Sequence, residues 1–330
     1  MTTLITGGTG LIGACLADKL LALGERVALF DLAPAEWRIA PLRSTAGDRL
    51  RVLRGDVTSL VELLDAVRET GATAVVHLAY VLGAESNANP ELAGRVNILG
   101  TTNVLEAGRL AGVRRVLLAS SIAVYGADAE YPSAALPLRE DAPLHVAKGV
   151  SLYGAGKVYL EHLGAAYARR HGLVVGGLRP SIVYGWGRER GASAFAGELV
   201  DRAAVGERVS VGFGDARVSL VYVADVAAQF LALLKADPGV FARRRFFNTG
   251  GDTCTVRGLA ENVRRLLPGA AIEVTSAGEP DVAGLAASVS DRALEEALGV
   301  RRTFTPLEVG LRAHIDVARA HAGREPIRWP

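Results

Sequence analysis

The chain contains few of the residues that mark metal-binding or disulfide-linked proteins. Only two cysteines occur among its 330 residues, Cys15 and Cys254, and neither belongs to a paired metal-ligand spacing. We therefore expect both to be small, buried hydrophobic side chains in a reducing cytoplasm. His77 has no second histidine at ligand spacing, so a hydrogen-bonded core residue is the simpler interpretation, and no metal is expected.

A strong charge bias and long apolar runs are also missing. The formal net charge is +2, with 37 basic residues scattered among 35 acidic ones, so the basic stripe that nucleic-acid binding needs is absent. No apolar run reaches the ~18 residues of a membrane span, and a strand is expected within three residues of the start, which leaves no room for a signal peptide. We expect a cytoplasmic protein without nucleic-acid or membrane partners.

What the chain does contain is a regular alternation of short apolar runs with longer amphipathic segments. We expect strands at residues 2–6, 26–31, 51–54, 73–78, 114–120, 173–178 and 245–248, and helices at residues 11–24, 58–70, 91–112 and 153–171. Runs such as TAVVHLA and RRVLLAS are apolar on both faces, as in a parallel sheet covered by helices on either side. This pattern predicts an α/β fold built on a doubly wound, Rossmann-type parallel sheet.

A glycine-rich segment, LITGGTGLIG, lies where the first strand should lead into the first helix. Gly7, Gly10 and Gly13 would allow a tight turn, a close ligand approach and close helix packing, so a pyrophosphate could bind at the helix N-terminus. The next strand ends at Asp31, whose carboxylate can bind the adenine ribose and would repel the extra phosphate of NADP. Either feature alone can be purely structural, but their spacing favours NAD.

Two further stretches carry candidate chemistry. Tyr153 and Lys157 lie four residues apart at the start of an expected helix, hence on one face. An ammonium placed there can stabilise a tyrosinate, which can act as a base near neutral pH. With four lysines in the whole chain, a chance pairing at this helix start is rare. Ser120 and Ser121 end a strand at the carboxyl edge of the sheet, where doubly wound folds bind ligands, although such serines are often turn residues.

Taken together, these and other motifs resemble the extended short-chain dehydrogenase/reductase family, of the NAD-dependent epimerase/dehydratase type. The motifs are TGGTGLIG, Asp31, GDVT at 55–58, HLA at 77–79, NILGTTNVLEA at 97–107, SSIAVYG at 120–126, YGAGK at 153–157, RPSIVYG at 179–185 and VYVADVA at 221–227. The resemblance spans nearly the whole chain.

The resemblance implies two parts. Residues 1–180 would form an NAD-binding Rossmann domain that also carries the catalytic residues. Residues 181–330, where the rhythm changes to glycine-rich and polar loops, would form mainly a smaller substrate-binding lobe, with the strand near 245–248 returning to the sheet.

Site residues follow from the resemblance position by position. Those implied to contact NAD are Gly7, Gly10, Leu11, Ile12, Asp31, Asp56, Val57, Leu78, Ala79, Tyr80, Asn97, Tyr153, Lys157, Pro180 and Val183. Tyr153 is similar to the family's catalytic base, Ser121 to the residue that holds the substrate oxygen, and Lys157 to the residue that holds the nicotinamide ribose. In the implied reaction, Tyr153 removes a hydroxyl proton while a hydride moves to the nicotinamide.

Departures from the family pattern concern the substrate. Family members that eliminate water resemble TDEVYG where this chain has Ile122 and Ala123, so a dehydratase is disfavoured. Nucleotide-sugar enzymes resemble RPFNVYG and TRDFVYV, whose polar anchors correspond here to Ile182 and Val218. A diphosphate would lack its partners unless nearby arginines replace them. Candidate substrate residues are Ser121, Leu82, Ile182, Tyr184, Trp186, Arg188, Arg190 and Arg217, although core packing is as plausible for the aromatic ones.

We therefore expect an NAD-dependent dehydrogenase that oxidises a secondary alcohol of a small sugar, polyol or hydroxy acid, within carbohydrate metabolism. The alternative is a nucleotide-sugar epimerase resembling UDP-galactose epimerase, which oxidises and re-reduces one carbon with tightly held NAD. A cofactor-sensing regulator on the same fold would not need Tyr153 with Lys157. The helices near 91–112 and 153–171 carry broad apolar stripes, so we also expect a homodimer with a four-helix interface.

Overall fold

The computed structural model describes residues 1–144, 151–191, 193–278, 284–301 and 303–329. At its centre lies a seven-stranded parallel sheet in the order β10-β6-β5-β4-β1-β2-β3. Its strands are β1 (Thr2–Thr6), β2 (Arg26–Asp31), β3 (Leu50–Arg54), β4 (Ala74–His77), β5 (Arg115–Ala119), β6 (Val174–Arg179) and β10 (Phe246–Asn248). All seven expected strands are present, and the order reverses between β1 and β4, so the doubly wound fold is confirmed.

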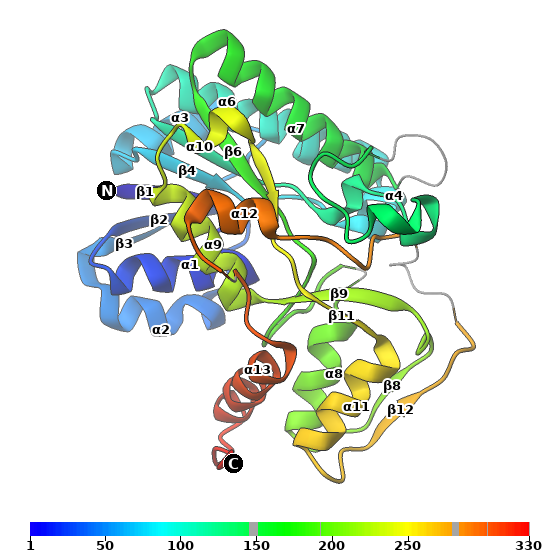
Figure 1. Cartoon of the computed structure of the whole chain (residues 1–330). Helices are drawn as coiled ribbons and strands as arrows, with labels where there is room; N and C mark the ends of the chain where they lie inside the picture. The colour runs from blue at the N-terminus through cyan, green and yellow to red at the C-terminus, as the bar shows by residue number, and fades with distance from the viewer. Residues whose placement is uncertain (145–150, 192, 279–283, 302, 330) are drawn as a thin grey trace.

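The sheet is covered by helices on both faces. Strands β4 and β5 are buried at every residue, as predicted for central parallel strands. On one face α1 (Leu11–Ala22) packs against α9 (Val223–Lys235), and on the other lie α3 (Leu60–Thr70), α6 (Gly100–Leu110) and α7 (Leu152–His171) (Figure 1). The apolar faces of these helices and strands form the two large clusters of the main core.

The helix expected at residues 91–112 is interrupted in the structure. It consists of α5 (Pro90–Ala93), a π-helical turn (Gly94–Leu99) and α6. Local widening of this kind is frequent near functional sites. Further short elements are α2 (Glu36–Ala46), α4 (Gly83–Ala88), α10 (Val240–Arg243) and 3₁₀ turns at Gly47–Arg49, Ile122–Val124, Asp128–Glu130 and Ser133–Ala135.

Residues after β6 build a second, smaller body beside the sheet (Figure 1). It contains a three-stranded sheet of β7 (Ile182–Tyr184), β9 (Arg217–Tyr222) and β11 (Asp252–Thr255), and a pair formed by β8 (Val209–Val211) and β12 (Ile272–Val274). Its helices are α8 (Phe195–Ala204), α11 (Val256–Leu266) and α13 (Leu307–His321). These elements share one apolar core of their own.

Parts of the chain beyond residue 180 return to the main sheet. Strand β10 pairs with β6 as expected, and α9 packs on α1, which the sequence pattern did not indicate. Helix α12 (Arg292–Leu298) lies against β10. Because the chain passes repeatedly between the two bodies, the division at residue 180 stays a prediction.

Within the described ranges, no helix is both long and apolar enough to span a bilayer.

Candidate functional site

The glycine-rich turn between β1 and α1 is shaped by close backbone contacts. Gly7 has φ +63°, and a Cβ on it would lie 2.7 Å from the backbone nitrogen of Ala79. A Cβ on Gly13 would lie 2.5 Å from the carbonyl oxygen of Gly8. Helix α1 starts after Gly10 without a side-chain cap, so its first backbone N–H groups are available to an anion. The glycine-rich turn and these uncapped N–H groups fit the pyrophosphate of a dinucleotide.

Asp31 lies at the end of β2, next to this turn. Its Oδ2 accepts hydrogen bonds from the backbone N–H (3.0 Å) and the hydroxyl (2.7 Å) of Thr9. The carboxylate is only partly buried, so it both fixes the turn and stays accessible to a ligand. Thr9 belongs to the glycine-rich motif, but its contact with Asp31 was not predicted.

Other residues implied at the cofactor have structural contacts of their own. The Oδ1 of Asp56 accepts a hydrogen bond from the backbone N–H of Thr58 (2.8 Å), and Val57 is buried. Asn97 lies in the π-helical turn, where its Oδ1 accepts from the N–H of Val81 (2.7 Å) and its Nδ2 donates to the Val81 carbonyl (3.1 Å). Asn97 therefore braces the loop after β4.

A cavity of about 420 Å³ opens at the carboxyl edge of the main sheet. Of the predicted cofactor and catalytic residues, those that line it are Ile12, Leu78, Tyr80, Ser121, Tyr153, Lys157, Pro180 and Val183. Of the further residues predicted to bind substrate, Leu82, Ile182 and Arg188 line it. The topology thus gathers residues from distant motifs around one space, at the location where doubly wound folds bind their ligands.

The three predicted catalytic side chains meet at this cavity. Burial raises the pKa of Tyr153, while a hydrogen bond with Ser121 and the charge of Arg188 lower it in part. The Nζ of Lys157 donates to the carbonyl oxygen of Ala119 (2.6 Å). The sequence led us to expect Lys157 to tune Tyr153. In the structure a further cation, Arg188, lowers the Tyr153 pKa, which four-residue helical spacing could not reveal.

Buried charges surround the lysine. Burial lowers the pKa of Lys157 well below its ordinary value, and the carboxylate of Glu161 opposes this. Burial and the lysine charge lower the pKa of His77 to about 3, so this histidine is neutral. Its ring nitrogens contact the hydroxyls of Thr6 (2.7 Å) and Thr101 (3.1 Å). His77 is a hydrogen-bonded core residue.

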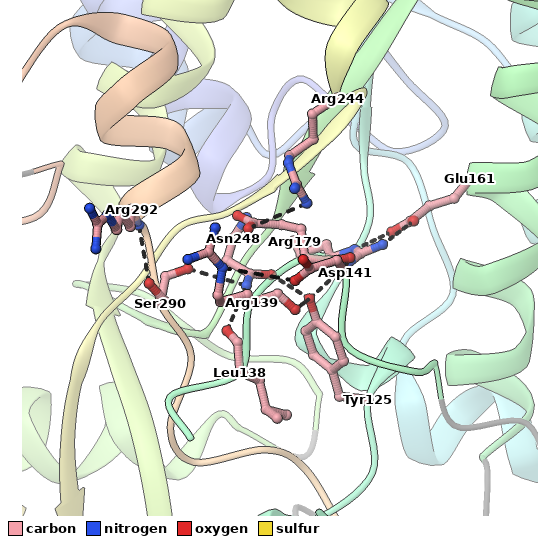
Figure 2. A network of polar contacts seen from close by, with 11 residues as sticks. Tyr125, Leu138, Arg139, Asp141, Glu161, Arg179, Arg244, Asn248, Ser290 and Arg292 are labelled. Carbon is pink, nitrogen blue, oxygen red and sulfur yellow. Dashed lines mark hydrogen bonds and ion pairs between the residues drawn. The ribbon is translucent and has the colours of Figure 1, made fainter. Parts of the chain in front are cut away.

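A buried ion pair supports the cavity wall from behind. Glu161 on α7 and Arg179 on β6 are joined by two hydrogen bonds, of 2.7 and 2.8 Å, and the Ser120 hydroxyl donates to the same carboxylate (2.6 Å). Figure 2 shows how Arg179 also reaches the hydroxyl of Tyr125 (2.6 Å), which donates to Asn248 on β10 (3.0 Å). A satisfied buried network of this kind rigidifies its surroundings, here the strand ends that carry Ser121 and Pro180.

Four predicted substrate residues do not line the cavity: Tyr184, Trp186, Arg190 and Arg217. Tyr184 is buried in the core of the smaller body, stacked beside His314, and Trp186 stacks on His321 with 3.5 Å between ring centroids. Arg190 and Arg217 are exposed. Arg217 is the first residue of β9 and is exposed, whereas the next four residues of the strand are all buried.

Arg188 is the predicted arginine that reaches the cavity. Its Nη2 donates to the Ser193 hydroxyl (2.6 Å), while its Nε is buried without a hydrogen-bond partner. No carboxylate in the described part of the chain forms an ion pair with it, and burial lowers its pKa. A half-buried guanidinium with a donor left unbonded is suited to a carboxylate or phosphate.

The loop that carries Arg188 is held from both sides. Gly187 has φ +74°, donates its N–H to Asp201 (3.1 Å) and accepts a hydrogen bond from Arg38 Nη2 (2.6 Å). Arg38 also donates to the carbonyl of Thr9 (3.2 Å). Helix α2 therefore connects the glycine-rich turn to the loop that carries Arg188. Sequence reasoning missed Arg38 because α2 has weak apolar periodicity and contains a proline.

Residues 3–245 match the model of the NAD dependent epimerase/dehydratase family. The chain belongs to this family.

The curated relatives include both chemistries that the sequence left open. The chain is 32% identical over 261 residues to a UDP-glucose 4-epimerase from Mycolicibacterium smegmatis, covering 77% of this chain and 79% of the relative. It is 31% identical over 286 residues to D-erythronate dehydrogenase from Cupriavidus necator, covering 81% and 82%.

Among solved structures, the UDP-glucose 4-epimerase from Thermus thermophilus in complex with NAD matches with a TM-score of 0.79 and 27% identity, over 97% of this chain and 99% of the other. The protein is thus an NAD-dependent enzyme of the oxidoreductase type within this family, and the predicted cofactor is confirmed.

Proposed function

We propose that this family member is a dehydrogenase for a small sugar, polyol or hydroxy acid, and that a hydroxy acid fits best. The observation that carries the proposal is the position of Arg188, whose half-buried side chain lines the same cavity as Ser121 and Tyr153. A substrate carboxylate would satisfy donors that the protein leaves free. The similarity to D-erythronate dehydrogenase supports the same substrate class.

In this proposal the cofactor is held mainly by residues 1–180. The glycine-rich turn would hold the pyrophosphate, Asp31 the adenosine ribose, and Lys157 the nicotinamide ribose. When bound, NAD supplies the ring that accepts a hydride. Residues 181–330 would mainly complete the substrate side through Arg188.

The protein's own groups would handle the proton and the charges. The Tyr153 oxygen takes the proton of the substrate hydroxyl, with Ser121 donating a hydrogen bond to the same substrate oxygen. Arg188 holds the carboxylate and, through its charge, favours the ionised form of Tyr153. The apolar side chains of Leu82 and Ile182 line the rest of the cavity and would exclude water from the reacting carbon.

The alternative function is nucleotide-sugar epimerisation, which the similarity to UDP-glucose 4-epimerases favours. Two features oppose it. Ile182 presents an apolar side chain to the cavity where the family's nucleotide-sugar enzymes resemble an asparagine. Arg217 is exposed and lies outside the cavity lining, so it does not replace the missing arginine. A diphosphate would have Arg188 as its main partner.

A substrate screen separates the two functions. NADH formation is followed with hydroxy acids, with neutral polyols of matched length and with UDP-hexoses. We expect net NADH from hydroxy acids and at least about tenfold lower kcat/KM with the matched polyols, because the charge-assisted bonds to Arg188 are lost. Arg188→Met should abolish this preference. Interconversion of UDP-hexoses without net NADH would establish the epimerase instead.

We also infer a cytoplasmic homodimer. Leu99 and Tyr159 are 46% and 47% exposed on the π-helical turn and on α7, which contact each other beside α6. Large apolar side chains on neighbouring helical surfaces fit a helical interface between two copies. Light scattering should give twice the chain mass of 34.6 kDa, and Tyr159→Glu should shift it toward the monomer. A monomeric mass for the unaltered protein would exclude the dimer.

A further inference from the structure

The ammonium group of Lys157 lies against the face of an aromatic ring. Its Nζ is 3.3 Å from the centroid of the Tyr80 ring and 5.3 Å from that of Tyr153. The two rings meet edge to face, with centroids 5.5 Å apart. A cation over a ring face is attracted by the ring quadrupole, and more strongly where water is excluded. Lys157 is buried, so this attraction is at its stronger limit.

Gly156 makes room for the hydroxyl carried by this ring. A Cβ on Gly156 would lie 2.5 Å from the Tyr80 hydroxyl oxygen, but 3.7 Å from the ring carbon that carries it. Any larger residue at position 156 would therefore push the ring away from its place under Lys157. The Tyr80 hydroxyl is itself buried without a hydrogen-bond partner in the described structure, so the contact with Lys157 depends on the ring rather than on the hydroxyl.

We propose that Tyr80 is a positioning residue whose ring face holds the Lys157 ammonium at the cavity, and that Gly156 provides the space that the Tyr80 hydroxyl needs while the ring keeps this place. The proposal rests on the proposed function in one respect, namely that the charge of Lys157 assists the ionisation of Tyr153. Tyr80 acts through Lys157 and takes no part in the proton transfer.

The charges around Lys157 determine what loss of the ring would do. Glu161 and Tyr153 face it from its own helix, and neutral His77 faces it from the end of β4. The charge of Arg188, on the loop that follows β7, lowers the pKa of Tyr153. Without the ring, the ammonium loses a stabilising partner, and Lys157 becomes neutral at lower pH. Tyr153 then ionises with less assistance, so the acid limb of kcat/KM moves to higher pH.

The first experiment compares Tyr80→Phe with Tyr80→Leu. Tyr80→Phe keeps the ring face and should retain the pH profile of the unaltered enzyme. Tyr80→Leu removes the face and should move the acid limb upward by about one pH unit, with about tenfold lower kcat near neutral pH and little change in substrate KM. A Tyr80→Leu profile that superimposes on that of the unaltered enzyme would overturn the proposal.

The second experiment needs no activity. Gly156→Ala should lower the thermal midpoint strongly in the unaltered protein and much less when combined with Tyr80→Phe, because the clashing oxygen is gone. Gly164→Ala is the matched control, since its Cβ would meet Val175 at 2.9 Å, which Tyr80→Phe does not relieve. Equal losses for Gly156→Ala in both backgrounds would contradict the proposed geometry. If no oxidised substrate is found, the proposed function fails, and this cycle still tests the position of Tyr80.

Discussion

Arg38 Nη2 donates a 2.6 Å hydrogen bond to the carbonyl oxygen of Gly187. The same guanidinium donates to the Thr9 carbonyl, and the Thr9 hydroxyl is bound by Asp31. A chain of direct contacts therefore runs from the expected ribose ligand to the residue that precedes Arg188. The position of Arg188, the arginine proposed to bind the substrate, therefore depends on α2.

The hydrogen bond from Arg38 to Gly187 predicts an effect on the substrate KM. Arg38→Ala should raise the substrate KM about tenfold, the equivalent of one charge-assisted hydrogen bond, with a much smaller change in kcat. Steady-state kinetics at saturating NAD would measure it. Arg43→Ala on the same helix is the control, because Arg43 pairs only with exposed Glu36 in the described structure. An unchanged KM for Arg38→Ala would show that the loop holds its position without this contact.

A second prediction concerns cofactor choice. NAD should bind at least about tenfold more tightly than NADP, because the Asp31 carboxylate repels the additional phosphate. Asp31→Asn keeps a hydrogen-bond acceptor for Thr9 but removes the charge, so it should reduce that preference without loosening the turn. Titration of both cofactors by tryptophan fluorescence would test this. Equal affinity of the unaltered protein for NAD and NADP would refute the role given to Asp31.

The third prediction concerns the base. Tyr153→Phe keeps the ring and its packing but removes the ionisable oxygen, so turnover should fall by about 10² to 10⁴ while NAD binding is retained. Ser121→Ala should lower turnover with little effect on NAD affinity. Lys157→Ala should weaken NAD binding as well. Near-normal turnover of Tyr153→Phe would mean that the proton leaves by another route.

The fourth prediction concerns how the stability of the fold depends on pH through the buried His77. His77 has a pKa of about 3 in the folded chain, against about 6.5 when unfolded. Between these values the unfolded chain binds one more proton, so stability contributed by His77 is complete above about pH 6.5 and is lost as the pH falls toward 3. The unfolding free energy should decrease by about 1.4 kcal/mol per pH unit from this group.

Urea titrations over that pH range would measure the slope. His77→Asn should flatten it by about one proton equivalent. An unaltered slope in His77→Asn would mean that His77 is protonated in the folded state.

Sequence reasoning succeeded where the signal was local or periodic. The strands are apolar runs bounded by turn residues, and the Tyr153–Lys157 pair follows from helical spacing, so their place at one sheet edge could be predicted. It failed for Trp186 and Arg217, because neither motif resemblance nor residue type tells which face of a strand or loop a side chain takes. The ion pair between Glu161 on α7 and Arg179 on β6 joins residues of two elements, and no helical or strand periodicity predicts such a pairing. The close approach of position 156 to the Tyr80 hydroxyl likewise appears only in the structure.

The return of α9 and β10 to the main sheet limits how this protein can be divided. A fragment ending at residue 180 would leave β6 as an open edge strand and would uncover the face of α1 that packs against α9 in the intact chain. Such a fragment should aggregate through that edge and face. Residues 181–330 therefore do not form a module that can be separated from residues 1–180. Recombination with relatives should succeed where α1 and α9 come from the same parent, and a single crossover between them, for example at residues 185–191, should fail.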